Sequence, residues 1–468
     1  MTLTTHRLTP LSAAFFDLED VDESASLAIG SFAIFEGPAP AFEEVVATIR
    51  GRLPLIPRYR QRVRWTPLGI AAPFWEDVAA FDIHDHVRRA ALPRPGGRDE
   101  IAQLVSQEMS VRMDRTKPLW EYVVVEGVSG GRWGLLSKVH HAMVDGVSGT
   151  DLYRLILDPS PEPGDAVPDG WEPQAPRSLA RTTLQAVGDL AVAPLRLTAA
   201  AAGAARRPRS AVRDAWHLAQ GAAALAGALV PTRHTSLGGP LAGASRYTWT
   251  TVDLADVRLI QEQLPGGLRP SINDVALAAV AGGLRRLLLA RGETPREHSV
   301  RTLVPVSTRT PGATPAPGNE VSLLLPFLPV DLEDPQARLL AVHERIRDLH
   351  ERHEDEAGGR LTNLAALSAF LPVDAGIRIG LRLPQQTITT VTTNVPGPRE
   401  PLFCLGREAL ELLPYVPIAD RVRVSIVMFS YAGTLTFGLT GDLATTADLD
   451  GLADAISASL DELVVASG

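Results

Sequence analysis

The stretch Lys138–Gly149 reads KVHHAMVDGVSG, and it determines how the rest of the chain is interpreted. It continues an apolar run that is typical of a buried strand. Gly146 and Gly149 then interrupt the pattern, so the two histidines, His140 and His141, are expected where a strand gives way to a loop. Such strand ends combine a fixed backbone with open access, which suits catalysis.

His141 is a candidate general base. A histidine with an ordinary pKa of about 6.5 can accept a proton at neutral pH and return it. Asp145 follows four residues later, in the pattern His-x-x-x-Asp-Gly, and its carboxylate would fix the loop or orient the imidazole. The chain has no G-x-S-x-G motif, and its single cysteine, Cys404, is distant in sequence. We therefore expect a histidine acting on a hydroxyl rather than a covalent acyl-enzyme.

Two other interpretations of the histidine pair stay open at this point. Adjacent histidines are often purely structural, and they can also be part of a metal site. A metal site needs a third and fourth ligand at suitable spacing. No H-E-x-x-H or C-x-x-C motif supplies them, so no metal is expected.

Length and composition set the broad class. The 468 residues suffice for one large domain or two of ordinary size, and 45% apolar residues provide a core. The net charge of −9 argues against general nucleic-acid binding. One cysteine excludes an internal disulfide and fits a reducing cytosol. Neither a signal peptide nor a run of about 18 apolar residues occurs. We expect a cytoplasmic protein that is soluble or lies on a membrane.

Alternating helical and strand patterns predict an α/β fold with mixed sheets. Strands are expected at Tyr122–Val125 and Trp133–Val139, joined as a hairpin that delivers the histidine pair. A long apolar helix is expected at Val275–Leu289. Strands at Val422–Tyr431 and Thr434–Leu439 are expected to pair across a tight turn.

A connector of different composition separates two halves of the chain. A proline-rich linker begins near Asp158, and Arg177–Arg233 is rich in alanine, with eight arginines against two acids. A basic, apolar-faced helix beside an acidic body predicts contact with a membrane surface. The alternative is a crossover helix pair whose arginines face water. We expect domains at residues 1–158 and 246–468, with the connector at 159–245.

The histidine motif also resembles that of a known superfamily. His140-His141-x-x-x-Asp145-Gly146 is similar to the active-site motif of CoA-dependent acyltransferases, which include chloramphenicol acetyltransferase and peptide-synthetase condensation domains. Over nearly its whole length, the chain resembles the bacterial wax ester synthase/diacylglycerol acyltransferase family. The further motifs that carry this resemblance occur in the family's order and are Pro118-Leu119-Trp120-Glu121, Ser271-Ile272-Asn273-Asp274, Val304-Pro305-Val306-Ser307-Thr308-Arg309, Gly318-Asn319 and Thr393-Asn394-Val395-Pro396-Gly397-Pro398.

The resemblance implies both a fold and an activity. The fold is two chloramphenicol-acetyltransferase-like domains with a tunnel at their interface. The activity is transfer of a long-chain acyl group from acyl-CoA to a diacylglycerol, to a long-chain alcohol, or to both. Acyl-CoA is then a co-substrate, and no cofactor is tightly bound. The partners are these lipids, with the inner membrane face or a lipid droplet as an expected surface.

The resemblance assigns the chemistry to two residues. His141 takes the proton from the acceptor hydroxyl. The amide of Asn273 donates to the oxyanion that forms when the hydroxyl attacks the thioester. The alternative is structural, because Ser271, Asn273 and Asp274 are all good residues for a helix start.

Further residues are implied to hold or line the site. His140 supports the loop, and Gly146 gives it backbone freedom. Asp145 pairs with an arginine, for which Arg60 is the first candidate and Arg309 the second; solvated arginines are the alternative. The residues implied to form the wall of the site or to contact substrate are Pro118, Leu119, Trp120, Ser271, Asp274, Asn394 and Pro396. From composition alone, a place in the core is the better explanation of Trp120.

Two other functions remain open. The same histidine would serve an acyltransferase with another acceptor, such as an amine, a glycan or a polyketide alcohol. A non-catalytic lipid-binding protein could also keep the fold, although a pure binder needs no base at the motif. The stretch Phe15–Gly37 lacks the Met-His pair of many family members, which affects acceptor selection more than chemistry.

Overall fold

The structure is a computed structural model of the chain. Three residues with expected roles, Asp145, Gly146 and Arg309, lie outside the part it describes, as does most of the connector. The described residues are 7–23, 25–66, 72–144, 153, 156–164, 167–175, 178, 183–184, 188, 192, 232–263, 268–307, 321–351 and 386–467.

The first sheet has six strands in the order β12-β13-β1-β6-β5-β4. Its pairs are antiparallel except for β4 and β5, which run parallel. The strands are β1 (Ala28–Phe35), β4 (Val87–Ala91), β5 (Trp120–Val128), β6 (Arg132–His140), β12 (Phe403–Cys404) and β13 (Arg407–Tyr415). The expected hairpin is confirmed as β5 and β6.

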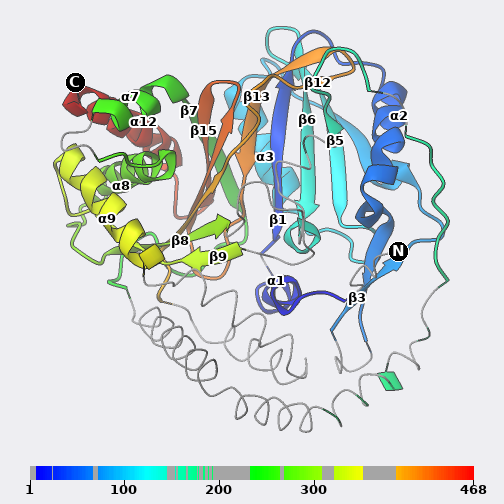
Figure 1. Cartoon of the computed structure of the whole chain (residues 1–468), viewed down its shortest axis with the longest axis horizontal. Coiled ribbons are helices and arrows are strands. Elements are labelled where there is room, and N and C mark those ends of the chain that lie inside the picture. Colours follow the sequence, from blue (N-terminus) through cyan, green and yellow to red (C-terminus); the bar gives the residue numbers. More distant parts are fainter. Residues whose placement is uncertain are drawn as a thin grey trace.

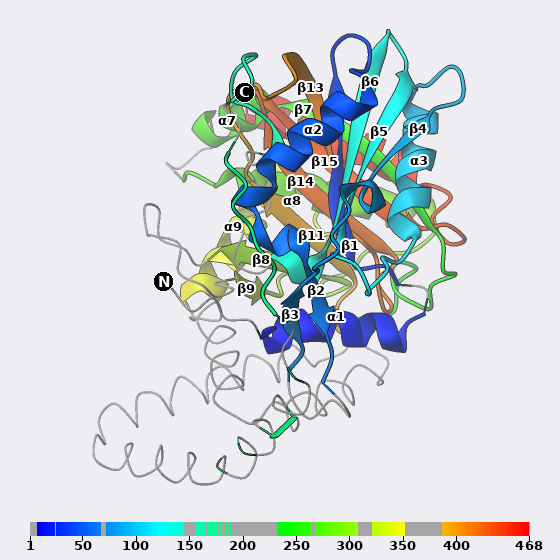
Figure 2. The ribbon, with the colours of Figure 1, turned by 90° about the vertical axis from the view of Figure 1, so that its right-hand side faces the viewer.

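Three helices accompany this sheet. α1 lies across the sheet end at which β6 stops (Figures 1 and 2). Thr9 caps α1, because its hydroxyl accepts the backbone N–H of Ser12 at 3.1 Å. The elements around the sheet are α1 (Pro10–Val21), α2 (Phe42–Arg52), α3 (Arg98–Ser110), the short helices η1 (Leu53–Leu55), η2 (Pro57–Arg60), η4 (Ile83–Asp85) and η5 (His141–Val144), and the small two-stranded sheet of β2 (Gln61–Arg64) and β3 (Phe74–Asp77).

The second sheet has the order β10-β8-β11-β14-β15-β7, with β9 paired to β8. β8, β11 and β14 run parallel, and the other pairs are antiparallel, so the sheet is mixed as expected. The strands are β7 (Ser245–Asp253), β8 (Val300–Ser307), β9 (Val321–Leu324), β10 (Phe327–Leu328), β11 (Thr390–Val395), β14 (Val424–Tyr431) and β15 (Thr434–Asp442). The predicted pairing across the tight turn is confirmed as β14 and β15.

Helices cover the second sheet on the side away from the first sheet (Figure 1). They are α7 (Leu254–Gln263), α8 (Ile272–Ala290), α9 (Pro335–Glu351) and α12 (Leu449–Ser467). α8 is buried over most of its length, from Asp274 to Leu284. Its neighbour α12 approaches closely at Gly283, where a Cβ would lie 2.5 Å from Cγ1 of Ile456.

The close packing of α8 and α12 predicts a large penalty for a side chain at Gly283. Gly283→Ala is expected to lower the free energy of unfolding by about 1–3 kcal/mol, because the new methyl overpacks the contact with Ile456. Gly51→Ala in α2 is the matched control, since a Cβ at Gly51 meets nothing within 4 Å. Urea unfolding measures both. Equal stability of the two variants would contradict the packing described.

The two halves of the chain are interleaved. β12 and β13 come from the C-terminal part of the sequence but complete the first sheet beside β1. Between the sheets, α3 of the N-terminal part contacts β7, and β13 contacts β14 and β15. The division into residues 1–158, 159–245 and 246–468 therefore stays a prediction. β12 and β13 lie in the C-terminal part of that division but belong to the first sheet.

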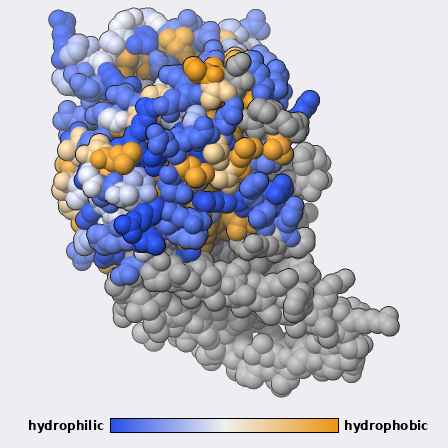
Figure 3. Space-filling model, turned by 90° about the vertical axis from the view of Figure 1, so that its left-hand side faces the viewer, coloured by the Kyte–Doolittle hydropathy of each residue, from blue (hydrophilic) through white to orange (hydrophobic). Residues whose placement is uncertain are grey.

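Polar side chains dominate the face formed by the helices of the second sheet, and the apolar patches on it are small and separate (Figure 3). Throughout the described ranges, no helix combines the length and the apolar character needed to cross a membrane.

Candidate active site

The histidine pair lies where β6 ends and η5 begins. Neighbouring backbone on both sides holds it. The N–H of His140 donates to the carbonyl of Leu119 at 2.9 Å, and the N–H of His141 donates to the carbonyl of Leu27 at 3.0 Å. Leu27 immediately precedes β1, and Leu119 immediately precedes β5. The Pro118-Leu119-Trp120 motif therefore supports the pair through a main-chain carbonyl.

His141 presents a neutral imidazole. Its ring stacks on Phe15 of α1 with 4.1 Å between centroids. Burial of the ring, followed by the electrostatic influence of neighbouring His140, lowers the pKa of His141 to about 4. The residue nevertheless keeps partial exposure. An imidazole that is unprotonated at neutral pH and reachable from outside can accept a proton from a substrate hydroxyl.

His140 is enclosed by protein groups. Its Nδ1 accepts the backbone N–H of Ala142 at 3.1 Å, so a ring proton is assigned to Nε2. Nε2 lies 3.4 Å from Oε1 of Glu19, and the ring stacks on Phe16 at 4.4 Å. With both nitrogens facing protein, this geometry favours the expected supporting role for His140.

Glu19 is a site residue that the sequence interpretation missed. This buried carboxylate on α1 accepts the N–H of Leu27 at 2.8 Å through Oε1 and the guanidinium of Arg115 at 2.9 Å through Oε2. Burial alone would raise the pKa of Glu19, but His140, the Leu27 N–H and Arg115 lower it to about 2. The only sequence signal is that Glu19 follows Phe16 by three residues and so shares its helix face.

The low pKa of Glu19 predicts acid-sensitive stability. The folded pKa of about 2 lies below the ordinary carboxyl pKa of 4.5, so the ionised carboxylate stabilises the fold above pH 4.5 and this stabilisation is lost as the pH falls to 2. The full effect is on the order of 3 kcal/mol. Glu19→Gln is expected to lower the free energy of unfolding at pH 7 by ~1–3 kcal/mol and to flatten its pH dependence over that range.

Denaturant unfolding at several pH values tests the predicted stability and acid sensitivity of Glu19→Gln, with Glu162→Gln as the control. Glu162 is exposed, so its replacement should change stability by less than about 0.5 kcal/mol. A Glu19→Gln variant with wild-type stability and wild-type acid sensitivity would contradict the role assigned to the carboxylate.

Arg60 has an ion-pair partner that the sequence analysis did not name. Its two terminal nitrogens bind the carboxylate of Asp169, at 2.9 Å and 2.5 Å, and its guanidinium lies over the ring of Trp171. Asp145 lies outside the described residues, so its pairing with an arginine stays a prediction, while the bidentate partner observed for Arg60 is Asp169. The partner comes from the proline-rich linker, which packs back on η2.

Trp120 is a core residue, as the composition-based alternative held. It is fully buried, and its Nε1 donates to the carbonyl of Tyr59 at 2.8 Å. Its ring stacks between those of Tyr59 and His86 at 4.6 and 4.5 Å. The tryptophan therefore stiffens the start of β5 behind the histidine pair.

Ser271 and Asp274 form a capping box at the start of α8. The Ser271 hydroxyl accepts the N–H of Asp274 at 3.1 Å, and the Asp274 carboxylate accepts the N–H of Ser271 at 2.8 Å. His343 of α9 contacts the same carboxylate through Nδ1 at 3.0 Å. Asn273, on the first turn, is partly exposed. The structural alternative thus accounts for Ser271 and Asp274, and their contact with substrate stays a prediction.

Asn394 and Pro396 lie at the end of β11. Asn394 is paired with Met428 of β14 and is partly exposed, and Pro396 is exposed. The expected site residues therefore occur in three places: the β6 end, the α8 start and the β11 end. Within the described part of the chain, no three metal-binding side chains lie together.

Comparison with known proteins identifies first the fold and then the family. The first condensation domain of the CDA synthetase shares the fold, with a TM-score of 0.60 at 15% identity over 99% of this chain and 97% of that one. The family model of the wax ester synthase/diacylglycerol acyltransferase catalytic domain matches residues 8–276, and that of the WS/DGAT C-terminal domain matches residues 317–464. The chain belongs to the wax ester synthase/diacylglycerol acyltransferase family.

Individual relatives match along the full chain. A probable diacylglycerol O-acyltransferase of Mycobacterium tuberculosis, tgs1, is 40% identical over 99% of this chain and 96% of its own. A putative diacylglycerol O-acyltransferase of the same species, Rv3371, is 31% identical over 98% and 91%. The solved wax ester synthase/diacylglycerol acyltransferase of Marinobacter aquaeolei VT8 has a TM-score of 0.66 at 25% identity, over 99% of this chain and all of that one. The predicted family, fold class and acyltransferase activity are confirmed.

Proposed function

We propose that this acyltransferase moves a long-chain acyl group from acyl-CoA to the free hydroxyl of a diacylglycerol, forming triacylglycerol, and that long-chain alcohols serve as a second acceptor class. The observation that carries the proposal is the neutral, partly exposed imidazole of His141 at the end of β6. The 40% identical relative, a probable diacylglycerol O-acyltransferase of Mycobacterium tuberculosis, supports the diacylglycerol acceptor.

The reaction proceeds without an acyl-enzyme. His141 removes the proton from the acceptor hydroxyl, and the oxygen attacks the thioester carbonyl. The tetrahedral intermediate collapses, the carbon–sulfur bond breaks, and the imidazolium returns its proton to the CoA thiolate. Cys404 is a poor nucleophile for any covalent alternative, because burial raises the pKa of its thiol to about 12.

Residues elsewhere complete the proposed site. Asn273 donates its amide to the oxyanion, an interaction typically worth about 3 kcal/mol of barrier. Asp145 and Gly146 shape the loop after η5, and Asn394 and Pro396 line the substrate path at the end of β11. The basic segment 177–233 contacts the lipid surface that supplies the acceptor.

The lowered pKa of His141 predicts an unusual pH profile. The base is inactivated only when its imidazole is protonated, which occurs below a pKa of about 4 in the free protein. We expect kcat/KM for acyl transfer to stay level from about pH 5.5 to 8, and its acid limb to lie well below the 6.5 of an ordinary histidine. An acid limb centred near pH 6.5 would contradict the described environment of the ring.

Product analysis with a panel of acceptors tests the proposed function. Labelled palmitoyl-CoA is incubated with a diacylglycerol, hexadecanol or hexadecylamine, and the lipid products are separated. We expect labelled triacylglycerol, with wax ester as the second product. Amide formation alone, or no lipid product from a folded protein, would contradict the proposal.

A further inference from the structure

Lys138 is a buried cation close to the histidine pair. It lies on β6 two residues before His140, so both side chains project from the same face of the strand. Its side chain is 2% exposed. Burying an ammonium group is unfavourable in free energy unless the group is well hydrogen-bonded. An apolar side chain at this strand position would carry no such penalty.

The ammonium group binds the end of α3. Nζ donates to the carbonyl of Glu108 at 2.7 Å and to the carbonyl of Val111 at 2.5 Å. Carbonyls in the last turn of a helix have no partner within the helix, and the helix dipole makes this end attractive to a cation. Lys138 therefore links β6, the strand that ends at the histidine pair, to the C-terminus of α3 by hydrogen bonds.

The same helix end is also tied to the segment that precedes β1. Ser26 donates its hydroxyl to the carbonyl of Val111 at 3.2 Å, so Ser26 and Lys138 share one acceptor. Arg112 donates through Nε to the carbonyl of Ala25 at 2.8 Å. Ser26 directly precedes Leu27, whose carbonyl receives the N–H of His141.

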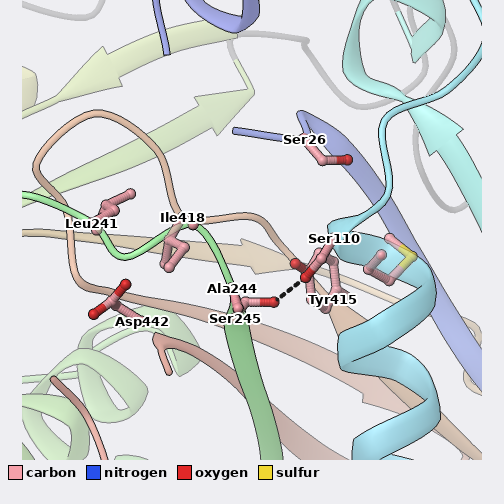
Figure 4. A pocket seen from close by; sticks show the side chains of 10 residues that line it. Ser26, Ser110, Leu241, Ala244, Ser245, Tyr415, Ile418 and Asp442 are labelled. Atoms are coloured by element: carbon pink, nitrogen blue, oxygen red, sulfur yellow. Dashed lines mark hydrogen bonds between the residues drawn. The ribbon is translucent and has the colours of Figure 1, made fainter. Parts of the chain in front are cut away.

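The helix end reaches the second half of the protein as well. Ser110 and Ser245 of β7 lie 2.7 Å apart through their hydroxyl oxygens. Figure 4 shows this bond beside a small cavity, with Ser26 above the helix end and Tyr415 next to Ser110. The C-terminus of α3 thus joins β6, the segment before β1, and β7.

We propose that Lys138 is a positioning residue for acyl transfer: by binding the Glu108 and Val111 carbonyls, it sets the place of the Leu27 carbonyl and, through it, the place of His141. This inference rests on the proposed function. Burial lowers the pKa of Lys138, and Glu121, Glu108, Arg88 and Glu19 act on its ammonium group electrostatically. The carboxylates of Glu108 and Glu121 are paired with Arg88. The hydrogen bonds of the Lys138 ammonium go instead to the carbonyls of Glu108 and Val111.

The test replaces Lys138 with methionine, which keeps the length and removes the charge. We expect kcat with palmitoyl-CoA and a diacylglycerol to fall by about 10- to 100-fold, with KM nearly unchanged, because a small displacement of His141 impairs the proton transfer and not the binding. Lys138→Arg should recover part of the loss. Lys117→Met is the matched control: Lys117 is partly exposed and paired with Asp85, and wild-type kcat is expected.

Ser26→Ala tests the same connection without touching the lysine. It should lower kcat severalfold, and its effect should be less than additive with that of Lys138→Met, because both act on the Val111 carbonyl. If Lys138→Met does not fold, the kcat of Ser26→Ala decides. A folded Lys138→Met or Ser26→Ala protein with wild-type kcat overturns the inference. Loss of acceptor-dependent transfer in the wild type would instead overturn the proposed function.

Discussion

Replacing His141 with alanine is expected to lower the rate of acyl transfer by about 10²–10⁴-fold, the range typical for loss of a general base. The N–H that holds the loop to Leu27 belongs to the backbone and survives the substitution. The variant loses the ring that stacks on Phe15, so a modest fall in melting temperature accompanies the loss of rate. Initial rates of CoA release at saturating palmitoyl-CoA measure the effect.

His84→Ala is the matched control for this experiment. His84 belongs to the short helix η4, is exposed, and takes no part in the contacts around the histidine pair. Its replacement should leave the rate unchanged. A folded His141→Ala protein that turns over at close to the wild-type rate would show that another group takes the proton.

Replacing Asn273 with alanine is expected to lower kcat by about 10²–10³-fold, with a small effect on KM. The reason is that an oxyanion donor acts on charge that exists only during reaction. The alternative for this position is structural, since Asn273 lies in the first turn of α8 beside the capping box of Ser271 and Asp274. The two interpretations predict different combinations of rate and stability.

Comparison with Ser271→Ala distinguishes the oxyanion role of Asn273 from a purely structural role. This substitution removes the side-chain acceptor of the Asp274 N–H and should destabilise the protein by about 1 kcal/mol while leaving kcat close to that of the wild type. If Asn273→Ala behaves in the same way, losing stability and not rate, Asn273 is only a helix-start residue and the oxyanion role is wrong.

Local patterns in the sequence predicted the local elements well. The β5–β6 hairpin, the β14–β15 pair and the α8 cap all follow from turn residues, alternation and capping chemistry, each of which acts over a few neighbouring residues. The motif Lys138–Gly149 placed the histidine pair at a strand end for the same reason. Hydrogen bonds within these elements connect residues close in sequence.

Contacts between segments that are distant in the chain could not be predicted from the sequence. Arg60 pairs with Asp169 across more than one hundred residues, and the linker that carries Asp169 has no periodic pattern to indicate where it packs. β13 joins the first sheet beside β1 although it lies in the C-terminal part of the chain. Strand alternation reveals a buried face but does not identify the partner strand.

Glu19 illustrates the same limit at the site itself. An acidic residue in an exposed-looking helix sequence is usually solvated, and only the fold brings α1 against the end of β6. Its neighbours His140, Leu27 and Arg115 come from three other parts of the chain. The buried Glu19 carboxylate thereby contacts both His140 and the segment before β1, whose Leu27 carbonyl holds His141.

The measurement that tests the account most directly is the stoichiometry of free CoA thiol and new ester in one reaction mixture, with palmitoyl-CoA and a diacylglycerol, for the wild type and His141→Ala. We expect equal amounts of thiol and triacylglycerol from the wild type, no thiol release without acceptor, and neither product above background from the variant. Thiol release that needs no acceptor, or ester formation that survives the loss of His141, would contradict this expectation.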